Sequence, residues 1–199
     1  MALILSSSIP DIQTLRKTYS RYVKSQLEDN NEIVLILPYY ETANNVRKTL
    51  SNSDFVNRGK TTNSDSNNSN GSSVIDVRKY EKVGSLMIID SVRGYFDSDS
   101  NYDGEDRLMS FFKQLVKNAE SLGKNGVSVI ADLGSFYHHQ SINATEKLFE
   151  HELSLPSKYD GMKFRGFCAY HKADFDIRFT EEQKQKLLDH HSKALMMAN

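Results

Sequence analysis

Charged and imidazole-bearing side chains follow most of the apolar runs of this sequence, at the points where strands of a sheet would end. Asp90, Asp132 and His171 each come directly after such a run. In an open α/β sheet these positions meet outside the carboxyl ends of the strands, where ligands bind. Carboxylates and imidazoles gathered there could bind a small polar ligand, hold a metal ion or transfer protons. The candidate ligand-binding residues are Tyr40, Glu41, Asp90, Arg93, Asp132, His138, His171 and Asp174.

Two of these candidates, Asp90 and Asp132, are expected to be partly buried because apolar residues directly precede them. A buried carboxylate needs a hydrogen-bonding or ionic partner. Arg93 and His171 are the expected partners, since both follow strands of the same predicted sheet. The serines at 6–8 follow the first apolar run and are expected at the same edge.

A divalent metal ion is an alternative occupant of this edge. His138, His171 and Asp174 could converge at the strand ends, and His190 could join them from the last helix. Such a set suits zinc or another divalent ion. The spacing matches no local metal-binding motif, so neither a metal site nor a cofactor is predicted. Cys168 lies inside an apolar run, where a buried structural cysteine is expected rather than a reactive thiol.

The segment between the first predicted strand and the first predicted helix lacks a phosphate-binding motif. A P-loop nucleotide hydrolase would have G-x-x-x-x-G-K-[ST] there, with glycines for close backbone approach and a lysine for the phosphates. Residues 6–11 instead read SSSIPD. The sequence also contains no G-x-G-x-x-G fingerprint and no G-x-S-x-G nucleophile elbow. These absences argue against P-loop ATP hydrolysis and favour a protein that is not an enzyme.

The elements that must position these residues alternate along the chain. Continuous apolar runs such as 33–37 suit strands that are buried on both faces of a parallel sheet. Amphipathic spacing marks helices between them, and Thr180 with Gln183 forms a capping box before the last helix. The alternation predicts an α/β protein with three α/β/α layers and a mostly parallel sheet. Strands are expected at 2–5, 33–37, 74–77, 86–89, 127–131 and 164–170, and helices at 10–27, 43–50, 108–122, 143–155 and 180–195.

Length and composition limit the class of protein. The chain has 199 residues, and 25 Lys+Arg against 26 Asp+Glu give a formal net charge of −1. This balance excludes a generally basic nucleic-acid binder. No apolar run is long enough to span a bilayer, and the first residues lack the basic region of a signal peptide. We therefore expect one cytoplasmic domain over residues 1–199, with no direct contact to membranes or nucleic acids.

One segment has a composition unlike the rest. Thirteen of the 23 residues at 51–73 are Ser or Asn, and only Phe55 and Val56 are apolar. Such a segment cannot bury enough surface to offset its ordering entropy. We expect residues 57–73 to form a flexible surface insertion. A tolerated insertion is preferred to a regulatory or partner-binding loop because long surface loops cost little additional free energy.

Six blocks of the sequence stand out, at 31–41, 84–91, 126–136, 151–156, 168–175 and 187–191. Together they resemble the MEDS family, the methanogen/methylotroph sensory domains, which are divergent relatives of the KaiC/RecA-like core. The likeness implies a RecA/KaiC-like sheet without a P-loop, and a sensory role in prokaryotic signalling with small organic ligands. The block that contains Asp90 looks like a Walker B strand, in which the aspartate serves magnesium, but the matching phosphate loop is absent. Any output is expected to pass through a partner protein.

Three functions fit these observations. The preferred one is a non-enzymatic sensory domain that binds a small ligand, anionic or polar, at the strand-end crevice and signals through a partner protein. A metal-assisted hydrolase or phosphoryl-transfer enzyme would use Asp90, Asp132 and the histidines for acid–base work. A degenerate RecA-like assembly protein would bind no ligand and would associate with copies of itself.

Overall fold

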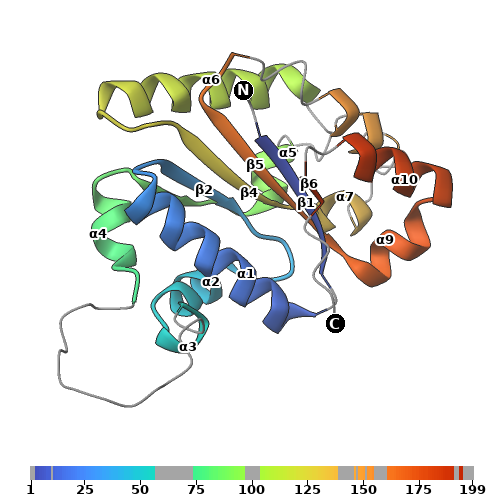
Figure 1. The fold of residues 1–199 in the computed structure, drawn as a ribbon, viewed down its shortest axis with the longest axis horizontal. Helices are drawn as coiled ribbons and strands as arrows, with labels where there is room; N and C mark the ends of the chain where they lie inside the picture. Colours follow the sequence, from blue (N-terminus) through green and yellow to red (C-terminus); the bar gives the residue numbers. More distant parts are fainter. Residues whose placement is uncertain are drawn as a thin grey trace.

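The computed structural model contains a six-stranded sheet with helices on both sides (Figure 1). The structure describes residues 3–9, 11–56, 74–96, 104–138, 146, 148–150, 152–154, 161–190 and 193–194. The strand order is β3-β2-β4-β5-β1-β6, and every pairing between these strands is parallel. The strands are β1 (Leu3–Ile9), β2 (Ile33–Leu37), β3 (Leu86–Ile88), β4 (Val127–Asp132), β5 (Phe164–His171) and β6 (Lys193–Ala194).

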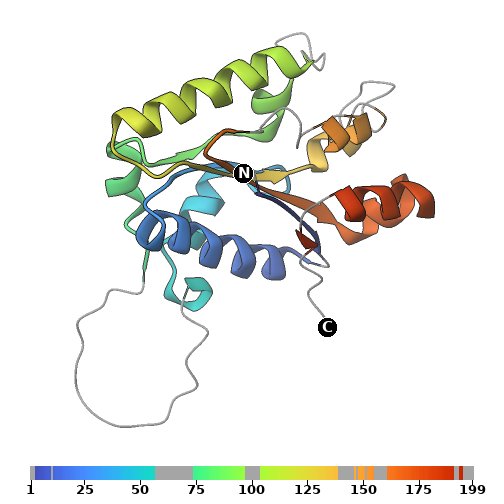
Figure 2. The same ribbon diagram turned by 45° about the horizontal axis from the view of Figure 1, so that its top comes forward.

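Helices connect these strands and cover both faces of the sheet. On one side lie α1 (Ile12–Lys24) with a following π-helical turn (Ser25–Asp29), α2 (Ala43–Leu50), α3 (Ser53–Val56) and α4 (Val77–Lys82). The others are α5 (Ser91–Tyr95), α6 (Gly104–Ser121), α7 (Gly134–His138), α9 (Lys172–Arg178) and α10 (Glu181–His190), and residues 148–150 and 152–154 are also helical. Figure 2 shows α6 and α1 on opposite sides of the strands.

Side chains of the central strands alternate between two apolar cores. In β2, Leu35 packs into the core under α6, whereas Val34 and Ile36 pack into the core under α1 and α2. In β5, Cys168 faces the first core and Phe167 the second. Successive residues of a strand point to opposite faces, so a continuous apolar run is buried completely only between two helical layers. The predicted three-layer α/β/α class is confirmed.

Polar residues at the strand–helix junctions begin several helices. Asp11 caps α1 by accepting a hydrogen bond from the Thr14 backbone N–H at 2.8 Å. Thr42 caps α2 in the same way, and the predicted capping box at Thr180 and Gln183 forms before α10. Such caps satisfy N–H groups that have no partner in the first helical turn.

Three predicted features of the secondary structure are wrong. The helix expected at 180–195 ends at His190, and Lys193–Ala194 instead form strand β6 beside β1. The serines at 6–8 do not follow a strand but lie inside β1, where Ser6 pairs with Cys168 of β5. They therefore do not lie at the carboxyl edge of the sheet, where they were expected. Only two residues separate β1 from α1. The strand expected at 74–77 is absent, because Asp76 accepts a hydrogen bond from the Lys79 N–H and begins helix α4.

Some predictions concern residues outside the described part of the chain. These are the insertion at 57–73 and the start of the helix expected from 143. Within the described residues, no helix has both the length and the apolar character that crossing a membrane requires.

Candidate functional site

Asp132 joins two loops at the carboxyl edge of the sheet. Its Oδ2 atom accepts hydrogen bonds from the backbone N–H of Tyr39 and of Tyr40, both at 3.1 Å. Its Oδ1 atom accepts the backbone N–H of Gly134, also at 3.1 Å. The chain leaves β2 toward β3 on one side and leaves β4 toward β5 on the other, so Asp132 lies at a topological switch point.

Asp132 is buried, as the sequence predicts, with 4% of its surface exposed. Its partners, however, are backbone groups and not the expected Arg93 or His171. Burial raises the pKa of Asp132 to about 6, although the backbone hydrogen bonds favour the charged carboxylate. This carboxyl group therefore organises the loops that follow β2 and β4.

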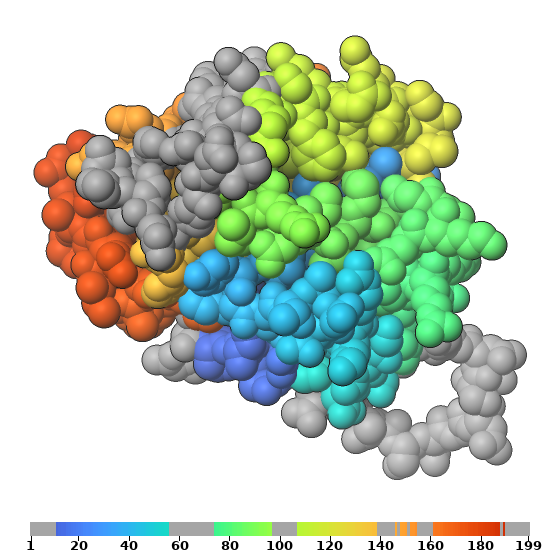
Figure 3. All heavy atoms as spheres, turned by 180° about the vertical axis from the view of Figure 1, so that it is seen from behind, coloured from blue at the N-terminus to red at the C-terminus, as the bar shows by residue number. Residues whose placement is uncertain are grey.

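Gly134 allows two tyrosines to lie directly over the β4–α7 junction. A Cβ atom at this position would come within 2.3 Å of Tyr40 Cε2 and 2.5 Å of Tyr39 Cδ1. The two rings are perpendicular, with centroids 5.2 Å apart. Tyr39 also stacks on His138 of α7, with centroids 5.7 Å apart and ring planes 4° apart. Figure 3 shows the segments after β2 and β4, in light blue and gold, meeting on one face.

Asp174, in the first turn of α9, connects this aromatic group to β5. The Tyr40 hydroxyl donates a hydrogen bond to Asp174 Oδ2. His138 Nε2 lies 3.3 Å from the same oxygen and 3.4 Å from the Tyr40 hydroxyl. Burial acts to raise the pKa of Asp174, but the hydrogen bonds from Tyr40 and His138 outweigh it and lower the pKa. Asp174 is therefore an ionised carboxylate with 19% of its side chain exposed.

His171 lies beneath Tyr40 at the end of β5. The two ring centroids are 3.5 Å apart, and His171 Nε2 is buried with no hydrogen-bond partner among the described residues. Burial lowers the pKa of His171, so the imidazole is neutral at pH 7. Five side chains thus form one group, which we call the edge cluster: Tyr39, Tyr40, His138, His171 and Asp174.

Glu41 is buried but belongs to the opposite side of the sheet. Arg16 of α1 contacts Glu41 Oε2 through Nε at 2.7 Å and Nη2 at 2.6 Å. The Tyr19 hydroxyl donates to Glu41 Oε1 at 3.1 Å. Both oxygens of Glu41 therefore attach the loop after β2 to α1, and this side chain does not join the edge cluster.

Asp90 and Arg93 also lie apart from the edge cluster. Asp90 is exposed, contrary to expectation, because β3 is the edge strand of the sheet. Its carboxylate accepts the Val92 N–H at 3.0 Å and caps α5. It therefore has a local structural role in α5.

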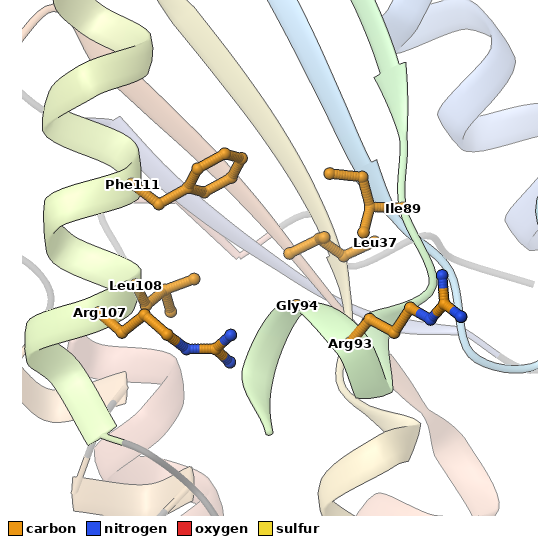
Figure 4. Close-up of a pocket in the computed structure, with 7 residues that line it drawn as sticks. All are labelled: Leu37, Ile89, Arg93, Gly94, Arg107, Leu108 and Phe111. Carbon is orange, nitrogen blue, oxygen red and sulfur yellow. The ribbon is translucent and has the colours of Figure 1, made fainter. Parts of the chain in front are cut away.

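Arg93 lies at the rim of a separate cavity of about 240 Å³ between α5 and α6. Figure 4 shows Phe111 and Leu108 of α6 pointing toward Leu37 at the end of β2. Arg107, on the same rim, donates a hydrogen bond to the Phe96 carbonyl at 2.9 Å. The lining is otherwise apolar; its residues are Leu37, Ile89, Arg93, Gly94, Arg107, Leu108 and Phe111.

The alternative metal site gains no support from the geometry. No group of three or more His, Cys, Asp or Glu in the described part of the chain is arranged to hold a metal ion. His138 and Asp174 are in contact, but the side chain of His190 lies outside the described residues. Cys168 is buried as predicted, and burial raises its pKa well above the ordinary value.

Sequence reasoning brings together four members of the edge cluster and omits Tyr39. It also misses the role of Gly134. A signal for Gly134 exists, because a glycine two residues after a strand-ending aspartate is typical of close backbone approach. The positions of the tyrosine rings above it depend on how β2 and β4 pair, which no local pattern specifies.

Comparisons with known proteins find similarity among solved structures only. No protein-family model matches the sequence, and no curated protein matches it. Among solved structures, a KaiC-like protein from the hyperthermophilic archaeon Pyrococcus horikoshii is similar over 86% of this chain, with 12% identity and a TM-score of 0.48. The match covers 63% of that chain.

Proposed function

We propose that this protein is a non-enzymatic sensory domain that binds a small organic ligand at the edge cluster and signals through a partner protein. The observation that carries the proposal is the convergence of polar side chains from the ends of β2, β4 and β5 at the switch point of the sheet. The resemblance of several sequence blocks to MEDS sensory domains agrees with this role.

Unused hydrogen-bonding capacity in the edge cluster supports a binding role. Both contacts to Asp174 among the described residues involve Oδ2, which leaves Oδ1 available as an acceptor. His171 Nε2 lacks a partner in the same part of the chain. A buried polar atom without a partner costs about 1–3 kcal/mol, so a ligand group that forms a hydrogen bond with it would recover that energy.

The proposal is tested by screening metabolites, nucleotides and metal salts at millimolar concentration for an increase in the melting temperature. A ligand that binds only the folded state at about 100 times its Kd stabilises it by about 2.7 kcal/mol. We expect at least one organic molecule to stabilise the protein and Asp174→Asn to weaken its binding by about ten-fold or more, because a charge-assisted hydrogen bond is lost.

Two further variants locate the ligand. Asp176→Asn is the matched control, since Asp176 is on the same helix but is exposed and paired with Lys172. Its binding should equal that of the wild type. Arg93→Gln examines the separate cavity between α5 and α6. If Arg93→Gln removes binding while Asp174→Asn does not, the ligand occupies that cavity and the assignment to the edge cluster is wrong.

A further inference from the structure

Tyr39 and Tyr40 lie beside the carboxylates of Asp132 and Asp174. Burial raises the pKa of the Tyr39 hydroxyl, and the charges of Asp132, Asp174 and Asp90 raise it further. Burial likewise raises the pKa of the Tyr40 hydroxyl, and the charges of Asp174 and Asp132 raise it further. The hydroxyls of both tyrosines therefore lie in a negative electrostatic field.

These carboxylates differ in their partners from several other buried or half-buried acids of the protein. Glu41 pairs with Arg16, Glu32 with Arg165, and Glu81 with Arg47. By contrast, neither Asp132 nor Asp174 forms an ion pair with a lysine or arginine within the described residues. Their partners are backbone N–H groups, a tyrosine hydroxyl and His138.

The aromatic rings of the cluster add a second feature that favours positive charge. The faces of tyrosine rings carry partial negative charge, and ammonium groups bind over them. Tyr39 and Tyr40 meet edge to face, while His138 stacks on Tyr39 and His171 lies against Tyr40. The remaining ring faces are those that a cation would contact. Asp174, hydrogen-bonded to Tyr40, supplies a full negative charge beside these rings. His171 adds no opposing charge because it is neutral at pH 7.

We propose that the ligand of the edge cluster is a small organic cation, an ammonium or alkylammonium compound, held by Asp174 and the rings of Tyr39 and Tyr40. This inference rests on the proposed function and specifies the charge of the ligand. It replaces the anionic ligand that the sequence left open. The cation pairs with Asp174 and places its methyl or methylene groups against the tyrosines.

The test uses three probes of similar size on the full chain: tetramethylammonium, neutral tert-butanol and anionic pivalate. Binding is followed by chemical-shift changes of backbone amides near Tyr39 and Gly134. We expect tetramethylammonium to bind about ten-fold more tightly than tert-butanol, because both the carboxylate and the ring faces favour charge. Pivalate should cause no shift at these amides.

Variants identify the groups responsible. Asp174→Asn and Tyr39→Leu should each weaken tetramethylammonium binding by about five-fold or more, which corresponds to loss of one ionic or cation–π contact. Asp176→Asn should bind like the wild type. Melting temperatures of all variants establish that they are folded.

The outcomes separate this inference from the proposed function. If tert-butanol or pivalate shifts the same amides as strongly as tetramethylammonium, the edge cluster binds ligands but does not select positive charge, and only the present inference is overturned. Cation binding that survives Asp174→Asn gives the same result. If no probe of any charge and no molecule of the metabolite screen binds at these residues, both proposals are wrong.

Discussion

Asp132 shows how one carboxyl group can organise a site without contacting the other ionisable groups around it. Three backbone N–H groups from two loops converge on its oxygens. In Asp132→Asn, the amide NH2 group must face at least one of these donors. A buried donor left without an acceptor costs about 1–3 kcal/mol, so the free energy of unfolding should fall by that amount at pH 7.

The pH dependence of the same variant gives a sharper measurement. Because burial raises the folded-state pKa of Asp132 to about 6, the folded protein binds a proton more tightly than the unfolded chain, whose carboxyl groups titrate near 3.9. The contribution of Asp132 to stability therefore increases as pH falls from about 7 toward 4. The difference in unfolding free energy between wild type and Asp132→Asn, measured in urea, should be larger at pH 5 than at pH 7.5. A difference that shrinks at pH 5 would place the pKa of Asp132 below its ordinary value.

The β4–α7 junction sets the distance between the two loops of the edge cluster. In Gly134→Ala the new methyl group would overlap both tyrosine rings, which must then move away from Asp132. Overpacking of this kind costs about 1–3 kcal/mol. We expect that loss in urea unfolding, together with weaker binding of the tetramethylammonium probe.

Gly94→Ala is the matched comparison, because its methyl group would approach only the end of the Leu37 side chain, at 2.9 Å from Cδ2. Leu37 lines the cavity between α5 and α6, so this end has room to shift. It should destabilise the protein less and leave probe binding unchanged. Equal effects of the two substitutions would mean that Gly134 has no special role in positioning the tyrosines.

The elements that carry the edge cluster differ in how well the sequence predicts them. Strand β2 is evident because it is a continuous apolar run that is fully buried. Strands β4 and β5 are evident because most of their residues are apolar and buried. Helices α5, α7 and α9 have five, five and seven residues, too few for helical periodicity to appear. The sequence therefore predicts which strand ends form the carboxyl edge of the sheet. It predicts only some of the side chains that meet at this edge.

The three-layer fold explains why some candidate site residues join the edge cluster and others do not. Glu41 immediately follows Tyr40, yet it turns to α1 while Tyr40 turns to α9. Asp90 follows an apolar run as Asp132 does, but it is exposed because β3 is at the edge of the sheet and β4 is inside it. Such differences depend on strand order, which only the complete fold determines.

The attachment of the β2 loop to α1 links one helical layer to the carboxyl edge. In Arg16→Met, the buried Glu41 carboxylate loses its only cationic partner among the described residues. Breaking a fully buried ion pair costs about 3–5 kcal/mol, and because the Arg16 side chain is 24% exposed, we expect a smaller loss of about 1–3 kcal/mol in unfolding free energy. Glu41→Gln in the Arg16→Met background should restore part of this loss, since no unpaired charge remains.

Arg47→Met is the matched control, because its partner Glu81 is 29% exposed, and it should cost less than about 1 kcal/mol. Equal losses in the two single variants, measured by urea denaturation, would show that the Arg16–Glu41 pair acts only as a surface ion pair and does not couple the layer to the site.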